Sequence, residues 1–217
     1  MATILVILAA AVLPLLTPWF IHPALDAAGS AGRLGLTEAQ AHTLSDRSVE
    51  ELVLGPGDFL IAGPDGQPFY DADERSHLRD ARLLLGLLLV AAGVALLGIA
   101  LALVRRRHQR AAVAMIIARA GLATAVVVVA LGLVALVAFD SLFRLFHQVF
   151  FPGGNWSFDP ATQRMVQLYP FGFWQIAATA LGLLVFVLGL ATWLLGRWLA
   201  GRASDHRSGS AASTVSG

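Results

Sequence analysis

The sequence predicts an all-α integral membrane protein with four transmembrane helices and an extracellular cap between the first and second. The prediction rests on the composition and on four long apolar stretches. Of the 217 residues, 57% are hydrophobic and 13% are charged, and the formal net charge is +1. Such a chain is far more apolar than a soluble domain. Apolar stretches of about 20 residues are long enough to cross a bilayer as helices.

The first apolar stretch covers residues 4–21 and is interrupted only by two prolines and a threonine. A cleaved signal peptide is the alternative interpretation. No basic residue precedes the stretch, and Trp19 and Phe20 stand at its far end, where aromatic side chains commonly anchor a helix at the membrane surface. We therefore expect an uncleaved transmembrane helix over residues 1–21.

Residues 22–82 form a polar segment with 11 acidic and 5 basic residues, which we interpret as an extracellular cap lying on the membrane. Thr37 and Gln40 have capping-box spacing, and so do Ser48 and Glu51. Because a capping box marks the start of a helix, these two pairs predict two short helices in the cap.

The second transmembrane helix is expected over residues 83–104, which carry no charge. Asp71 and Glu74 have capping-box spacing upstream, so we expect a helix that starts there and continues into the membrane. Residues 105–110 follow as a loop with four arginines. By the positive-inside rule this loop is cytoplasmic.

Two more transmembrane helices follow from the remaining apolar stretches. Both termini are then cytoplasmic, and the cap and the aromatic loop share the outer face of a bacterial plasma membrane, because arginines recur after the last helix. The predicted segments are a third helix at 111–147, an extracellular aromatic loop at 148–170, a fourth helix at 171–197 and a disordered cytoplasmic tail at 198–217.

Two histidines fall where predicted helices leave the outer leaflet. His77 lies six residues before the second apolar stretch, and His147 lies at the end of the third helix. A neutral imidazole is a natural general base near pH 7, and a carboxylate on its other nitrogen would fix the tautomer. Asp80, at i+3 from His77, and Asp140, at i−7 from His147, could supply that carboxylate.

Plainer interpretations of the same residues remain open. Aromatic side chains at helix ends usually form an interfacial belt, and Asp140 with Arg144 has the spacing of a simple i,i+4 ion pair. The other four histidines are expected to be solvated: His22, His42, His108 and His206.

No cysteine is present, so disulfides and thiolate ligands are excluded, and no histidine spacing indicates a metal site. We expect no cofactor and no metal. The alternative function is a non-catalytic membrane protein that binds haem, a metal or a partner through its cap.

Two blocks of residues resemble a known family. The first is Glu74-Arg-Ser-His77-Leu-Arg-Asp80, and the second is Phe146-His147-Gln-Val-Phe-Phe followed by Trp156-Ser-Phe-Asp159-Pro. With the number and order of helices, they are similar to the bacterial lipoprotein intramolecular transacylase family. The chain contains arginine but no lysine and is rich in alanine, and this composition favours an actinobacterial member of the family.

The resemblance implies transfer of an acyl chain from the glyceryl moiety of a diacylglyceryl lipoprotein to the amine of its N-terminal cysteine. The partners implied are this lipoprotein and membrane lipid, with no nucleic acid, and the oligomeric state stays open. The two family histidines that are implicated in catalysis fall on His77 and His147. The candidate oxyanion donors are Arg144, Asn155 or backbone N–H groups of the loop. We expect supporting roles for seven further residues: Glu74, Asp80, Asp140, Arg144, Asn155, Trp156 and Asp159.

Overall fold

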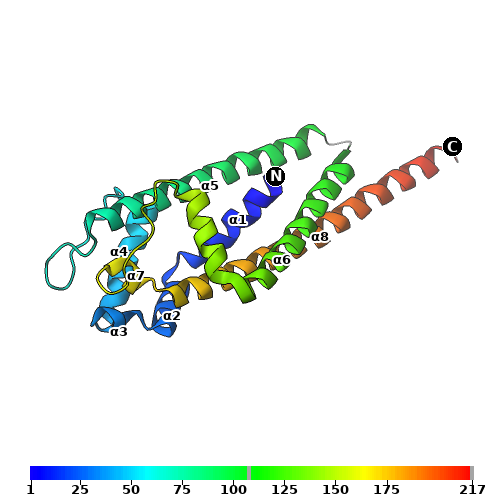
Figure 1. Cartoon of the computed structure of the whole chain (residues 1–217). Coiled ribbons are helices and arrows are strands. Elements are labelled where there is room, and N and C mark those ends of the chain that lie inside the picture. Colours follow the sequence, from blue (N-terminus) through cyan, green and yellow to red (C-terminus); the bar gives the residue numbers. More distant parts are fainter. Residues whose placement is uncertain (107–108, 216–217) are drawn as a thin grey trace. The chain divides into compact units, whose positions relative to one another are not determined.

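The computed structural model describes residues 1–106 and 109–215, with side chains through Arg202. Within these residues, helices are the only regular elements beyond one isolated bridge between Ala62 and Pro68. Figure 1 shows the helices in chain order. They are α1 (Ala2–Leu15), α2 (Pro18–Ala28), α3 (Ser30–Leu34), α4 (Glu38–Val53), α5 (Ala72–Arg105), α6 (Arg110–Phe150), α7 (Arg164–Leu168) and α8 (Phe171–Val215).

Among the residues that the structure describes, three helices are long and apolar enough to cross a membrane: α5, α6 and the part of α8 up to Arg202. Their apolar side chains are largely uncovered, as on α5, where Val90, Val94 and Leu97 are 67 to 69% exposed. Such a surface suits lipid and not water. The predicted class, an all-α integral membrane protein, is confirmed.

The first apolar stretch is not one continuous helix. α1 ends at Leu15, α2 begins at Pro18, and the two are bent by 67° at the break. Pro18 occupies the first turn of α2, where its missing N–H costs nothing, and the Thr17 hydroxyl donates to the carbonyl of Pro14. The pair is either a broken span or a re-entrant loop, which corrects the single straight helix expected over residues 1–21.

The chain forms two compact units. One comprises residues 1–11, 89–133 and 182–217, and the other comprises residues 12–88 and 134–181. In the first unit small residues bring α6 and α8 together: a Cβ added at Gly121 would lie 2.7 Å from the carbonyl oxygen of Gly189. Close approach of backbones at small residues is the usual way that membrane helices pack.

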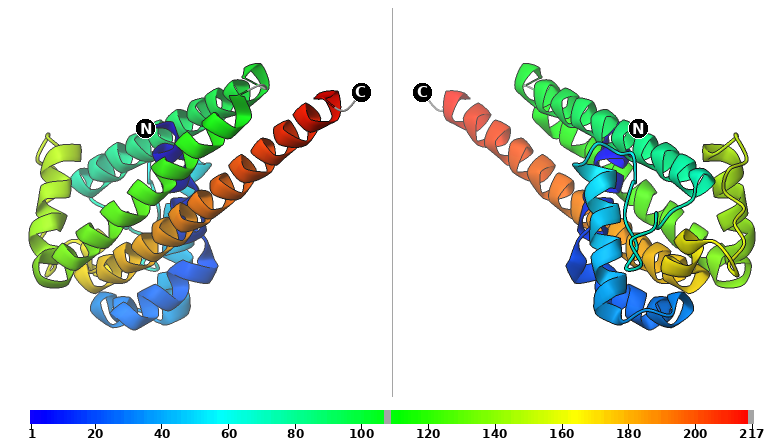
Figure 2. Two further views of the ribbon diagram at one scale, coloured as in Figure 1. Left: turned by 90° about the vertical axis from the view of Figure 1, so that its right-hand side faces the viewer. Right: turned by 90° about the vertical axis from the view of Figure 1, so that its left-hand side faces the viewer.

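The second unit contains the cap, in which α2, α3 and α4 lie together in both views of Figure 2. Its hydrophobic core includes Leu25, Phe59, Tyr70 and Leu168, each at most 1% exposed. These residues come from α2, from the segment between α4 and α5, and from α7. The cap therefore has a core of its own.

Helix α4 begins at the predicted capping box, in which Thr37 and Gln40 bond reciprocally. The second predicted helix start, at Ser48, is wrong. α4 continues through Val53, and the Ser48 hydroxyl binds the Leu44 carbonyl and the hydroxyl of Tyr70. Ser48 therefore lies inside α4, where its hydroxyl forms a tertiary hydrogen bond and does not cap a helix.

Two of the histidines that were expected to be solvated instead join α2 to α4. The Nε2 atom of His22 lies 2.8 Å from Asp46, that of His42 lies 2.7 Å from Asp26, and the rings stack with centroids 4.1 Å apart. His108 lies outside the described residues, and the side chain of His206 lies outside the described side chains.

The long helices differ in detail from the predicted segments. α6 contains one non-helical residue, Ala138, with φ −140° and ψ 33°, so its last turns, which carry His147, form a separate stretch. α8 is helical through Val215, whereas the sequence predicts a disordered tail at 198–217; residues 216–217 lie outside the described residues.

Candidate active site

The rings of His77 on α5 and His147 on α6 stack with centroids 5.8 Å apart and planes at 21°. Each residue is 8% exposed. All of the site lies in the unit that contains the cap. Two buried imidazoles side by side are unusual for a structural core, because both polar rings must find hydrogen bonds. The structure thus brings together the two histidines that the sequence singled out.

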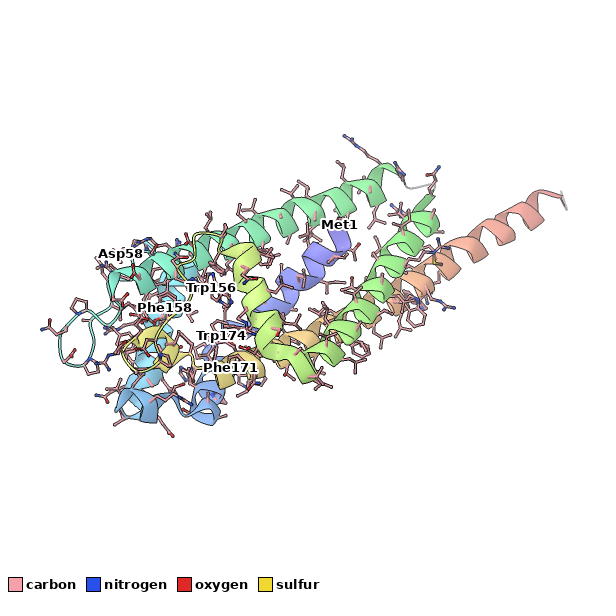
Figure 3. All side chains as sticks on the ribbon, viewed as in Figure 1. Met1, Asp58, Trp156, Phe158, Phe171 and Trp174 are labelled. Atoms are coloured by element: carbon pink, nitrogen blue, oxygen red, sulfur yellow. The ribbon has the colours of Figure 1, made fainter. Side chains whose placement is uncertain are left out.

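Aromatic rings surround the pair. Phe151, which directly follows α6, is close to both histidines, and the loop beyond it supplies two more rings, labelled in Figure 3. These rings pack against both imidazoles, in keeping with the low exposure of the two histidines. The centroid distances are 4.5 Å from Phe151 to His77, 5.4 Å from Phe151 to His147, 5.5 Å from Phe158 to His77, 5.3 Å from Trp156 to His147 and 4.3 Å from Phe143 to His147.

A backbone carbonyl orients His147. Its Nδ1 lies 2.7 Å from the carbonyl oxygen of Phe143, one helical turn earlier. Because a carbonyl only accepts, Nδ1 must carry the proton, and in a neutral ring Nε2 then holds a lone pair. This arrangement leaves Nε2 as the atom of His147 that can take a proton.

Asp80 binds an amide and no imidazole. Its Oδ2 accepts from Nδ2 of Asn155 at 2.8 Å, and the same Nδ2 lies 3.3 Å from the Ser76 hydroxyl. Both N–H groups of Asn155 thus face α5, while its Oδ1, an acceptor, is buried without a partner. Nδ1 of His77 is likewise buried without a partner. Asn155 is therefore an anchor for the loop, and its predicted role as an oxyanion donor is not supported by this geometry.

Asp140 and Arg144 form an i,i+4 ion pair, with side chains 59% and 54% exposed. This is the plain interpretation that the sequence allowed. The prediction that Asp140 orients His147 is wrong, because the Phe143 carbonyl occupies Nδ1. Arg144, paired and exposed, is not directed at the histidines by any described hydrogen bond.

Glu74 is a buried carboxylate, 1% exposed, that joins the loop to α5. Its Oε2 accepts from the N–H of Asp71 at 2.8 Å, and the Glu74 N–H donates to Asp71 at 2.8 Å, which confirms the capping box. Its Oε1 accepts from the N–H of Met165 in α7 at 2.6 Å. One side chain therefore fixes both the start of α5 and the end of the aromatic loop.

Asp159 organises a turn at the far end of the loop. Its carboxylate accepts from the Ala161 N–H at 2.9 Å and from the Thr162 hydroxyl at 3.2 Å. Gln163 accepts from the N–H of Asp159 at 2.7 Å and donates to Asp71 at 3.1 Å. Asp159 thus shapes the loop and does not contact the histidines through any described hydrogen bond.

Two tyrosines, the buried Tyr70 and the half-buried Tyr169, form hydrogen bonds to α4. Tyr70 lies 2.7 Å from the Ser48 hydroxyl, and Tyr169 lies 3.0 Å from Ser45. Burial raises the pKa of Tyr169 to about 12 and also raises the pKa of Tyr70. Both stay neutral near pH 7. Tyr70 therefore links α4 to the start of α5, and Tyr169 links α4 to the end of the aromatic loop.

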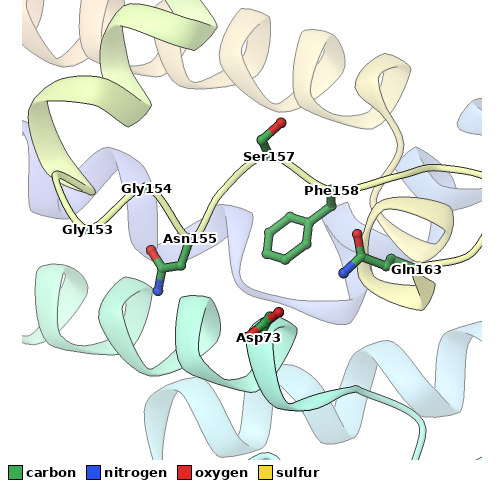
Figure 4. A pocket seen from close by; sticks show the side chains of 7 residues that line it. All are labelled: Asp73, Gly153, Gly154, Asn155, Ser157, Phe158 and Gln163. Carbon is green, nitrogen blue, oxygen red and sulfur yellow. The ribbon is translucent and has the colours of Figure 1, made fainter.

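A polar groove lies between the aromatic loop and the start of α5 (Figure 4), with about 490 Å³ of empty space when open solvent is included. Asn155 and Phe158 line it and also contact the site. The other lining residues are Gly153, Gly154 and Ser157 of the loop, with Asp73 and Gln163. Among the described residues, no group of three His, Asp or Glu side chains could hold a metal ion.

Comparison with known proteins decides the family. The family model of lipoprotein intramolecular transacylase, Lit, matches residues 42–174, which is more than half of the chain and includes both histidines. The chain belongs to the lipoprotein intramolecular transacylase family. It is accordingly a membrane transacylase. The alternative of a non-catalytic membrane protein is not supported.

Solved structures of the lipoprotein intramolecular transacylase Lit from Bacillus cereus share the fold. One has a TM-score of 0.73 at 19% identity and covers 93% of this chain and 92% of that chain. Two variants with a histidine replaced by arginine or by alanine have TM-scores of 0.63 and 0.62 at 18% identity. They cover 94% and 93% of this chain, and 90% of each of those chains. A search of curated proteins found no match.

Proposed function

We propose that this lipoprotein intramolecular transacylase moves an acyl chain from the glyceryl moiety of a diacylglyceryl lipoprotein to the α-amino group of its N-terminal cysteine. The product is an N-acyl, S-monoacylglyceryl lyso-form. The observation that carries this proposal is the stacked pair of His77 and His147 inside an aromatic wall. Acyl transfer needs a base and an acid at one ester, and the pair offers two imidazoles within reach of one group.

His147 is the base. Its Nδ1–H is held by the Phe143 carbonyl, so Nε2 has the lone pair that accepts the proton of the attacking amine. The amine nitrogen forms a bond to the ester carbonyl carbon, and the ester C–O bond to glycerol then breaks. The amine must be neutral to attack, so the reaction slows at low pH.

His77 is the acid: it receives the proton that His147 took from the amine and gives it to the glycerol oxygen as that oxygen leaves. The amine loses one proton and the glycerol oxygen gains one, so the transfer is balanced without any cofactor or ATP. Both imidazoles are neutral again when the transfer is complete. The rings are close enough, at 5.8 Å between centroids, to act on opposite ends of one tetrahedral intermediate.

Orientation supplies much of the rate. Amine and ester belong to one substrate molecule, so the protein has only to hold them in line, and such pre-orientation is worth up to about 7–11 kcal/mol. The oxyanion needs a donor. We assign this role to the indole N–H of Trp156, since its ring lies 5.3 Å from His147, whereas Asn155 and Arg144 are engaged elsewhere.

We further propose that the site lies at the outer leaflet, with both termini in the cytoplasm. The support is the arginine-rich loop at 105–110 and the arginines near the end of α8, which belong on the inner side by the positive-inside rule. The substrate would then approach from the same leaflet in which lipoproteins are anchored.

The experiment uses a bacterial host without any other enzyme that acylates lipoprotein amines. Mass spectrometry of lipoprotein N-termini should show the lyso-form with the wild-type protein and none with His77→Ala or His147→Ala. The control is His22→Gln, which lies in the cap and should keep wild-type activity. A normal lyso-form yield from either of the two alanine variants would contradict the proposed roles.

A further inference from the structure

We propose that the polar groove between the aromatic loop and the start of α5 binds the polypeptide of the lipoprotein just after its lipidated cysteine, through backbone hydrogen bonds. This inference rests on the proposed function and extends it to the part of the substrate that is not lipid. The substrate joins acyl chains to a polypeptide at one cysteine, so the polypeptide must leave within a few ångströms of the reacting amine.

The two sides of the site differ in chemistry. Toward α6, His147 is flanked by aromatic rings, and the last turns of α6 expose Phe146 and Phe150 at 45% and 49%. That side suits acyl chains. The Phe158 ring, 5.5 Å from His77, also lines the groove, and most of the other lining groups there are polar. A chain of amide groups leaving the cysteine fits this second side.

The groove offers groups that recognise a backbone and not a particular side chain. Gly153 and Gly154 present bare main chain, and Ser157 and Gln163 add a hydroxyl and an amide. A Cβ at Gly154 would meet nothing within 4 Å, and one at Gly153 would meet only Oδ1 of Asn155 at 4.0 Å. The space above both glycines is therefore open, as an extended peptide requires.

The charge of the groove adds a preference. Asp73 is the one charged residue that lines it, and Asp73 is exposed. A carboxylate there favours neutral or basic residues after the cysteine and disfavours acidic ones, by a modest factor because exposed charges are screened.

The test measures binding of unreactive substrate analogues in which an ether replaces the sn-2 ester. One analogue is S-diacylglyceryl-type cysteine amide, and the other continues for four residues beyond the cysteine. We expect the wild-type protein to bind the longer analogue about tenfold more tightly, which corresponds to roughly one or two net hydrogen bonds. Equal binding of the two analogues by the wild-type protein would overturn the proposal.

Gly153→Leu fills the groove without requiring a positive φ, and it should bring the affinity ratio close to one. The matched control is Gly32→Leu in the cap, where an added Cβ would likewise meet nothing close by. This variant should keep the wild-type affinity ratio. Retention of the ratio by Gly153→Leu would also overturn the proposal.

A second variant does not depend on the fit of a larger side chain. In wild-type protein, analogues with lysine after the cysteine should bind about threefold better than those with aspartate, and Asp73→Asn should remove this preference. An unchanged preference in Asp73→Asn would contradict the role of this groove. Failure of the proposed function looks different: ester substrates would yield no lyso-form, while the ether analogues would keep their length preference.

Discussion

Replacing Glu74 should release the aromatic loop from α5. The buried carboxylate accepts from the N–H groups of Asp71 and Met165. Hydrogen bonds to a charged group are each worth about 1.5–3 kcal/mol, and the alanine variant also leaves the Met165 N–H without its partner. Because the two bonds share one side chain, their losses do not add fully. We expect Glu74→Ala to lower the free energy of local opening around α7 by about 3 kcal/mol.

Hydrogen exchange followed by mass spectrometry measures this opening. A loss of about 3 kcal/mol corresponds to an increase of roughly 100-fold in the exchange rate of peptides that cover residues 159–170. Glu74→Gln retains one acceptor oxygen and should show a smaller increase. Peptides from residues 115–130, which lie in the other compact unit, are the internal control. Unchanged exchange at 159–170 in Glu74→Ala would refute the assigned role of Glu74.

Three further predictions follow from the site. Trp156→Phe keeps an aromatic ring beside His147 and removes the N–H, so acyl transfer should fall by about 10²-fold; a rate within threefold of wild type would exclude the indole as the oxyanion donor. Asp140→Ala breaks only an exposed ion pair worth about 0–1 kcal/mol, so both activity and melting temperature should stay close to wild type, and a loss of transfer would restore Asp140 to the site. Since the chain has no cysteine, Gln67→Cys should react with an impermeant thiol reagent on intact cells and Gln109→Cys should not; the reverse pattern would invert the topology.

Local sequence patterns predicted much of the fold. The apolar stretches predicted helices for the long elements, and the spacing of Asp71 and Glu74 predicted the start of α5. These features depend on neighbours three or four residues apart, so a sequence displays them directly. The same rule failed at Ser48, because a tertiary partner, the Tyr70 hydroxyl, used the side chain inside a helix.

The sequence predicted the two histidines at the centre of the site, but it did not predict the groups that hold them and the loop in place. The resemblance to a family pointed to His77 and His147, and the predicted topology put both on the same side of the membrane. The orienting group of His147 could not be predicted from charge, since it is a backbone carbonyl at i−4, which every helical residue has. Asp80 and Glu74 were identified as supporting residues, but their partners, Asn155 and Met165, are 75 and 91 residues away in the chain.

The most direct test of the account follows the acyl chain itself. The purified protein is mixed in liposomes with two synthetic diacylglyceryl lipopeptides. One lipopeptide has a deuterated sn-2 chain, and the other has a heavier peptide. Mass spectrometry then gives the masses of the N-acylated products. We predict that every acyl chain stays with the peptide of its own molecule, and that His77→Ala and His147→Ala give no product. Exchange of labels between peptides, or undiminished product from either variant, would contradict intramolecular transfer by this histidine pair.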